Sequence, residues 1–175
     1  MSDPTSRTTV RFHPGDYFPM PMTSIERQVR AFVAGDHIKN LLAGEFVPLR
    51  DEEGQLLAGI RGRIGACGIT AEGVEFGVDL IEMDPPACFP LHTHPGDHLL
   101  CVLQGEGIVH VDGIDHPVGV GDSIFVPADY PHGVKTPPLP LDSSDGPPAR
   151  PFRFLAAGHP HKHVSASDRM HRVDR

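Results

Sequence analysis

The chain has 175 residues, 39% hydrophobic and 22% charged, which indicates one globular domain with modest extensions. A formal net charge of -8 argues against a nucleic-acid or anionic-membrane partner, and no apolar run is long enough to span a bilayer. The three cysteines fit neither a zinc ribbon nor a redox pair, which favours a reducing compartment, so we expect a cytoplasmic protein.

Residues 1–44 are expected to form an N-terminal arm with a short helix. The first 22 residues are polar and rich in proline, which is typical of an arm lying on a surface. Thr23 or Ser24 can cap a helix that runs from Ile25 towards Ala34. Gly35-Asp36 is expected to end this helix, and a short amphipathic piece is predicted over residues 37–43.

Residues 45–158 alternate between short apolar segments and turn residues. The chain holds 19 glycines and 19 prolines, which suits a turn-rich β-domain and not a helical one. With no internal repeat, this spacing predicts a single sandwich or barrel. The expected strands are 46–49, 56–60, 64–69, 74–83, 99–103, 107–111, 116–120, 123–126, 132–136 and 152–157, with a loop over 137–151.

Residues 159–175 are polar and rich in histidine. His159, His161 and His163 alternate along the chain and could form a second metal-binding tract. A disordered or surface tail is the interpretation we favour for this region.

The most informative stretch is Pro90–His98, which holds three histidines in nine residues. In an extended segment His92 and His94 point to the same side, because side chains alternate between faces. Pro95-Gly96 is expected to turn the chain, so that His98 on the next strand can approach the same centre. Two imidazoles from one strand and a third from its neighbour would form most of a transition-metal shell.

A second block has Gly121-Asp122, then Pro127, then His132. The spacing of the two blocks resembles the paired signature of the cupin superfamily, over about residues 74–136. The resemblance implies an all-β double-stranded β-helix, or jelly-roll barrel, and often a homodimer. It also implies one divalent metal per chain, held by His92, His94, His98 and His132.

The chain departs from this family where a glutamate is usual, since that position holds His98. Asp97, one residue earlier, is the competing ligand, but it is expected to point away from the face that carries His98, Leu100 and Val102. Four neutral imidazoles leave the site with a charge of +2 and leave up to two positions of an octahedral ion open. Fe(II) or Mn(II) is favoured, and Ni, Co, Cu or Zn would also fit.

We expect an enzyme whose substrate is a small organic molecule that chelates the metal. A dioxygenase-like oxidoreductase is the leading hypothesis, with a non-redox lyase or isomerase and a non-catalytic metal- or ligand-binding barrel as the alternatives. Val78 is expected in the apolar barrel wall. The other side chains predicted to contact the substrate are Phe76, Leu100, Val102, His110, Asp129 and Tyr130.

Overall fold

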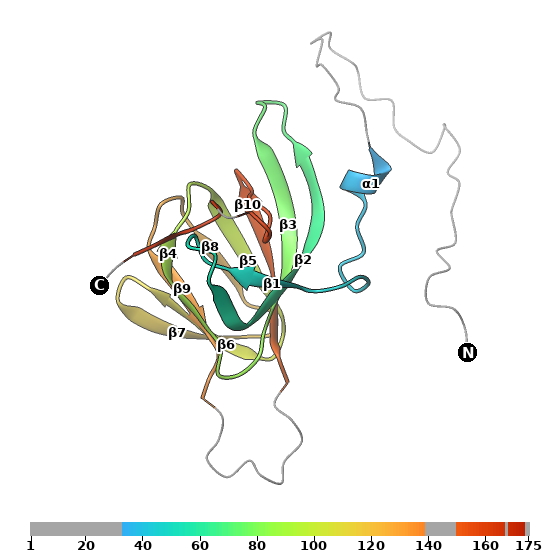
Figure 1. Ribbon diagram of the computed structural model, residues 1–175. Coiled ribbons are helices and arrows are strands. Elements are labelled where there is room, and N and C mark those ends of the chain that lie inside the picture. Colours follow the sequence, from blue (N-terminus) through green and yellow to red (C-terminus); the bar gives the residue numbers. More distant parts are fainter. Residues whose placement is uncertain (1–32, 139–149, 167, 174–175) are drawn as a thin grey trace, which may run out of the picture.

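The structure is a computed structural model, and it describes residues 33–138, 150–166 and 168–173 (Figure 1). Its described elements are one short helix and eleven strands. They are α1 (Ala34–His37), β1 (Val47–Arg50), β2 (Leu56–Ile69), β3 (Glu75–Met83), β4 (Cys88–Thr93), β5 (Asp97–Gln104), β6 (Glu106–Val111), β7 (Ile114–Gly119), β8 (Ser123–Val126), β9 (His132–Lys135), β10 (Phe152–His159) and β11 (His171–Arg172).

The strands form two antiparallel sheets, in the orders β1-β2-β3-β10-β5-β8 and β11-β4-β9-β6-β7. Consecutive strands such as β4 and β5 lie in different sheets, so the chain crosses between layers as it does in a jelly roll. The predicted all-β jelly-roll barrel is confirmed. Figure 1 shows the two layers, with the β2–β3 hairpin extending beyond them.

The space between the sheets is filled by apolar side chains that alternate along the strands with outward-facing ones. The buried side chains that pack there include Leu49, Ile60, Ile81, Met83, Phe89, Leu100, Val102, Val109, Val134, Phe152 and Phe154. The histidine pocket described below opens from this core.

Two expectations about the elements are wrong. Residues 56–60 and 64–69 belong to one strand, β2, because the glycine between them, Gly62, pairs with Ile81 on β3 and does not turn the chain. A side chain at Gly62 would contact Val164 and Leu49, so this glycine permits close packing. Gly35 and Asp36 lie inside α1 and do not end it.

The part of the predicted helix before residue 33 lies outside the described residues, as does most of the predicted 137–151 loop. The amphipathic piece expected over residues 37–43 is not helical beyond His37. Among the described residues, no helix combines the length and the apolar character needed to cross a membrane.

The residues that follow β10 differ most from expectation. Residues 160–166 and 168–173, hereafter the C-terminal segment, run back across the barrel and add β11 beside β4. His161, Val164 and Met170 are buried, with exposed fractions of 2%, 6% and 1%. The interpretation of this region as a surface tail is therefore wrong for the described residues.

Candidate metal centre and pocket

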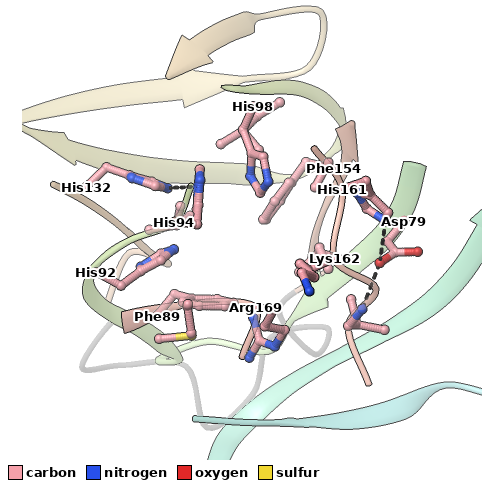
Figure 2. A pocket seen from close by; sticks show the side chains of 16 residues that line it. Asp79, Phe89, His92, His94, His98, His132, Phe154, His161, Lys162 and Arg169 are labelled. Atoms are coloured by element: carbon pink, nitrogen blue, oxygen red, sulfur yellow. Dashed lines mark hydrogen bonds and ion pairs between the residues drawn. The ribbon is translucent and has the colours of Figure 1, made fainter. Parts of the chain in front are cut away.

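Three of the predicted ligands gather at one place. His92 lies on β4 directly opposite His132 on β9, and His94 follows the end of β4. All three side chains are buried, and one ring nitrogen of each lies within 4.8 Å of the others. Figure 2 shows the three rings converging from the same side of the pocket.

Backbone carbonyls fix the orientation of each ring. Nδ1 of His92, His94 and His132 lies 2.8, 2.7 and 2.9 Å from the carbonyl oxygens of Pro90, Gly96 and Tyr130. A carbonyl oxygen only accepts, so each Nδ1 must carry the proton and donate it. Each Nε2 is left with a lone pair, which is how protein scaffolds prepare histidines as metal ligands.

The donor set fits a divalent metal. Nε2 of His94 lies 3.3 Å from Nε2 of His132, and neither nitrogen has a proton to give the other. Two nitrogens bound to one ion at 2.0–2.1 Å would be separated by about 2.9–3.4 Å, which includes this distance. Burial lowers the pKa of His92 and His94 and lowers the pKa of His132 to about 4, so all three rings are neutral near pH 7, as ligands must be.

His98, on β5, lines the same pocket, but its ring nitrogens do not join the cluster formed by the other three histidines. Its ring stacks on that of His94, with ring centroids 3.6 Å apart, and burial lowers the pKa of His98 to about 3. It does not belong to the trio whose nitrogens all lie within 4.8 Å of one another. His98 as a fourth ligand stays a prediction. Asp97 is exposed and accepts a hydrogen bond from the backbone N–H of Ala128, as expected for a side chain that points away.

The histidines form one end of a pocket that is partly open to solvent, with an empty volume of about 560 Å³ when the open solvent at its mouth is included. Apolar side chains make up much of its wall, and the C-terminal segment contributes two cations and a fifth histidine, His161 (Figure 2). The lining residues outside the histidine end include Ile81, Phe89, Leu100, Val134, Phe154, Asp79, His161, Lys162, Arg169 and Met170.

Arg169 is a pocket-lining cation whose hydrogen bonds are only partly satisfied by the described residues. Its Nη2 donates to the carbonyl of Arg50, and its guanidinium lies 5.2 Å from the centroid of the Phe89 ring. Its Nε is buried with no hydrogen-bond partner among the described residues. Burial lowers the pKa of Arg169 to about 10, so the group is charged near pH 7.

Some of the residues predicted to contact the substrate line the pocket, and others do not. Leu100 lines the pocket, and Val102, on the same face of β5, is buried in the adjoining core. Phe76 and Val78 do not line it, because on β3 the residues of opposite parity, Asp79 and Ile81, do. Phe76 is instead 50% exposed.

The other three predictions involve residues near the site but outside the pocket wall. His110 pairs with Asp115 on the β6–β7 hairpin and does not line the pocket, and its substrate contact stays a prediction. The side chains of Asp129 and Tyr130 do not line the pocket either. Their backbone supports it: the Asp129 N–H donates to the carbonyl of His94, and the Tyr130 carbonyl orients His132.

The C-terminal segment supplies the site residues that sequence reasoning missed: Arg169, Met170 and His161 as part of the pocket. The segment lacks strand or helix periodicity, so no pattern placed it against the core. The available signals were the alternating histidines and Met170, a large apolar residue in a polar stretch.

With this geometry in place, comparison with known proteins shows what the chain is similar to. Residues 79–137, which include the three gathered histidines, match the family model described as "Cupin domain". This stretch of the chain is therefore similar to a cupin domain. A solved RmlC-like cupin from Shewanella frigidimarina is similar in fold, with a TM-score of 0.53, 20% identity, and coverage of 73% of this chain and 93% of that one.

Two curated relatives come from Ruegeria pomeroyi. The chain is 26% identical to dimethylsulfoniopropionate lyase DddW over 102 residues, which are 58% of this chain and 67% of the relative. It is 24% identical to dimethylsulfoniopropionate lyase DddQ over 146 residues, covering 70% of this chain and 71% of that relative.

Proposed function

We propose that the protein is a metal-dependent cupin enzyme that catalyses a non-redox elimination or isomerisation of a small carboxylate. The observation that supports this most is the Arg169 guanidinium, a positive charge that lines the same pocket as the three-histidine site. A guanidinium in a largely apolar pocket suits a carboxylate, which it can bind with two hydrogen bonds.

The histidines, Arg169 and the apolar side chains of the pocket have separate roles in this proposal. His92, His94 and His132 would hold the divalent ion, which when bound supplies Lewis-acid polarisation of a substrate oxygen. Arg169, from the other wall of the pocket, orients the carboxylate, so the substrate is held at two points. Phe89, Phe154 and Leu100 exclude water, which strengthens both electrostatic contacts.

The comparisons favour a lyase over the dioxygenase that the site chemistry alone suggested. Both relatives described above are named as lyases, and neither name refers to oxygen chemistry. The identities of 26% and 24% support the reaction class and leave the substrate open. The dioxygenase stays a prediction, and one experiment separates it from the lyase.

That experiment compares turnover with and without oxygen. Protein purified without a histidine tag is analysed for metal, reloaded with Fe(II), Mn(II), Zn(II) or Ni(II), and incubated anaerobically with carboxylates that carry a leaving group on the β carbon, dimethylsulfoniopropionate among them. We expect NMR to show a new alkene at a rate that oxygen does not change. An H92A/H132A variant should lose this activity, and a K135M variant, whose lysine pairs with Asp115 and does not line the pocket, should keep it.

Turnover that consumes oxygen in proportion to product would select the dioxygenase. A metal-loaded protein that binds a carboxylate but converts none would select the non-catalytic barrel. Either result would refute the proposed lyase activity.

A further inference from the structure

A second cluster of metal-ligand types lies away from the three-histidine site. Asp79 projects from β3, and His161 and His163 come from the C-terminal segment, with one ligand atom of each within 4.8 Å of the others. Asp79 and His161 are almost fully buried, with exposed fractions of 1% and 2%, and His163 is half-buried. Figure 2 shows Asp79 and His161 at the opposite end of the pocket from His92 and His132.

Part of the role of Asp79 is structural. Its Oδ1 accepts a hydrogen bond from the backbone N–H of Gly65 at 3.1 Å, and its Oδ2 accepts one from that of Val164 at 2.9 Å. These bonds attach the C-terminal segment to β2 and β3. A carboxylate has about four lone-pair sites, so two remain, and these face the two histidines.

The histidine contacts do not have the geometry of strong hydrogen bonds. Oδ2 of Asp79 lies 3.4 Å from Nε2 of His161, and Oδ1 lies 3.3 Å from Nδ1 of His163. A charge-assisted N–H to carboxylate bond is about 2.7–2.9 Å long. Donor atoms that share one ion at 2.0–2.2 Å are separated by about 2.9–3.5 Å, which includes both distances.

The ring of His161 gives independent support for an ion at this cluster. Both of its ring nitrogens are buried, and neither has a hydrogen-bond partner among the described residues. A buried polar group without a partner is costly, so native structures seldom retain one without a reason. The rings of His161 and His163 meet edge to face with centroids 4.9 Å apart, which lets both approach one ion.

We propose that Asp79, His161 and His163 bind a second divalent cation. Two imidazoles and one carboxylate, with an open fourth position, are the ligand set that Zn²⁺ takes in many three-ligand sites. Because Asp79 and His161 line the pocket, this ion would lie in its wall and would fasten the C-terminal segment to the barrel. This site goes beyond the proposed lyase activity and does not depend on it.

The test measures zinc in a protein that lacks the first site. Wild type and the H92A/H132A variant are stripped with chelator, dialysed against Zn²⁺ and analysed by mass spectrometry. We expect about two zinc ions per wild-type chain and about one per H92A/H132A chain, since each site needs its own ligands. Adding H163A to H92A/H132A should remove the remaining ion, whereas adding H171A, on the exposed β11, should not.

Folding is checked by circular dichroism and thermal melting. H163A is used because His163 is only half-buried, whereas Asp79 and His161 are buried, so its removal should disturb the fold least. Zn²⁺ should raise the melting temperature of H92A/H132A and leave that of H92A/H132A/H163A unchanged. A folded H92A/H132A protein that binds no zinc would overturn the proposal, and Asp79 would then serve only as a hydrogen-bond anchor.

Cobalt distinguishes a competing ligand set. Cys67, Glu75 and His163 also have ligand atoms within 4.8 Å of one another. Co²⁺ bound to H92A/H132A should give ligand-field bands without a thiolate-to-cobalt charge-transfer band, and D79N should abolish the ligand-field bands. A charge-transfer band that disappears in C67S would place the ion on Cys67 and refute the assignment to Asp79 and His161.

Discussion

Replacing Arg169 by methionine tests whether the pocket is built for an anion. Methionine keeps most of the side chain's length and apolar contact while removing the charge and its donors. In the free protein the change removes the hydrogen bond to the Arg50 carbonyl and the contact with the Phe89 ring, each worth about 1 kcal/mol. It also removes a buried Nε without a partner, a cost of about 1–3 kcal/mol.

These effects oppose each other, so R169M should have a free energy of unfolding within about 1 kcal/mol of wild type. Binding should change much more. A hydrogen bond between charged groups contributes about 1.5–3 kcal/mol, so R169M should bind a carboxylate about 10- to 150-fold more weakly. Stability and binding are therefore expected to separate in this variant.

The assay is calorimetric titration of propionate into zinc-loaded wild type, R169M and the control K135M, with urea unfolding of each. K135M should bind like wild type, because Lys135 pairs with Asp115 and does not line the pocket. If R169M binds propionate within about threefold of wild type, a difference of less than 1 kcal/mol, Arg169 is not the carboxylate anchor.

Three further predictions concern the fold and its assembly. M170A, which truncates a side chain that is 1% exposed, should cost about 2–5 kcal/mol in urea unfolding, whereas L42A, at a site 80% exposed, should cost less than about 0.5 kcal/mol; equal effects would mean that the C-terminal segment is not packed. Folding lowers the pKa of His132 from 6.5 to about 4, so between these pH values the unfolded chain binds a proton that the folded chain does not. The free energy of unfolding of the metal-free protein should therefore fall by up to about 3 kcal/mol as pH falls from 6.5 towards 4. Urea unfolding of H132A should show a smaller decrease over the same range. The expected homodimer should appear in sedimentation at micromolar concentration, and F125D should shift it to monomer, because Phe125 and its register partner Leu99 are 63% and 44% exposed side by side on β8 and β5; a monomeric wild type would contradict this.

The histidine site could be predicted well because its residues obey local rules. His92 and His94 share a face through strand alternation, and the position of His132 follows from the second block of the motif. Phe76, which lies outside the pocket, shows the limit of the same rule. Alternation assigns Phe76 and Val78 to one face, but which face of β3 meets the pocket depends on the other sheet, which local sequence does not encode.

The remaining wall of the pocket could not be read from sequence for a different reason. Arg169 and His161 lie in irregular backbone, where position is set by long-range bonds such as the one from the Val164 N–H to Asp79, 85 residues earlier. Composition marks such a stretch as polar, and polar stretches usually stay outside. Only the tertiary contacts show that this one completes the pocket.

Because of the C-terminal segment, some residues that shape the pocket are separate from the residues that hold the strands in register. The three clustered histidines lie on or beside β4 and β9, where a change can disturb strand pairing, while Arg169 and Met170 belong to neither sheet. Substitutions at these two positions can alter which molecules fit without altering the register of a strand. A library aimed at new substrates is therefore best randomised around residues 168–170, with the rest of the barrel left as a constant scaffold.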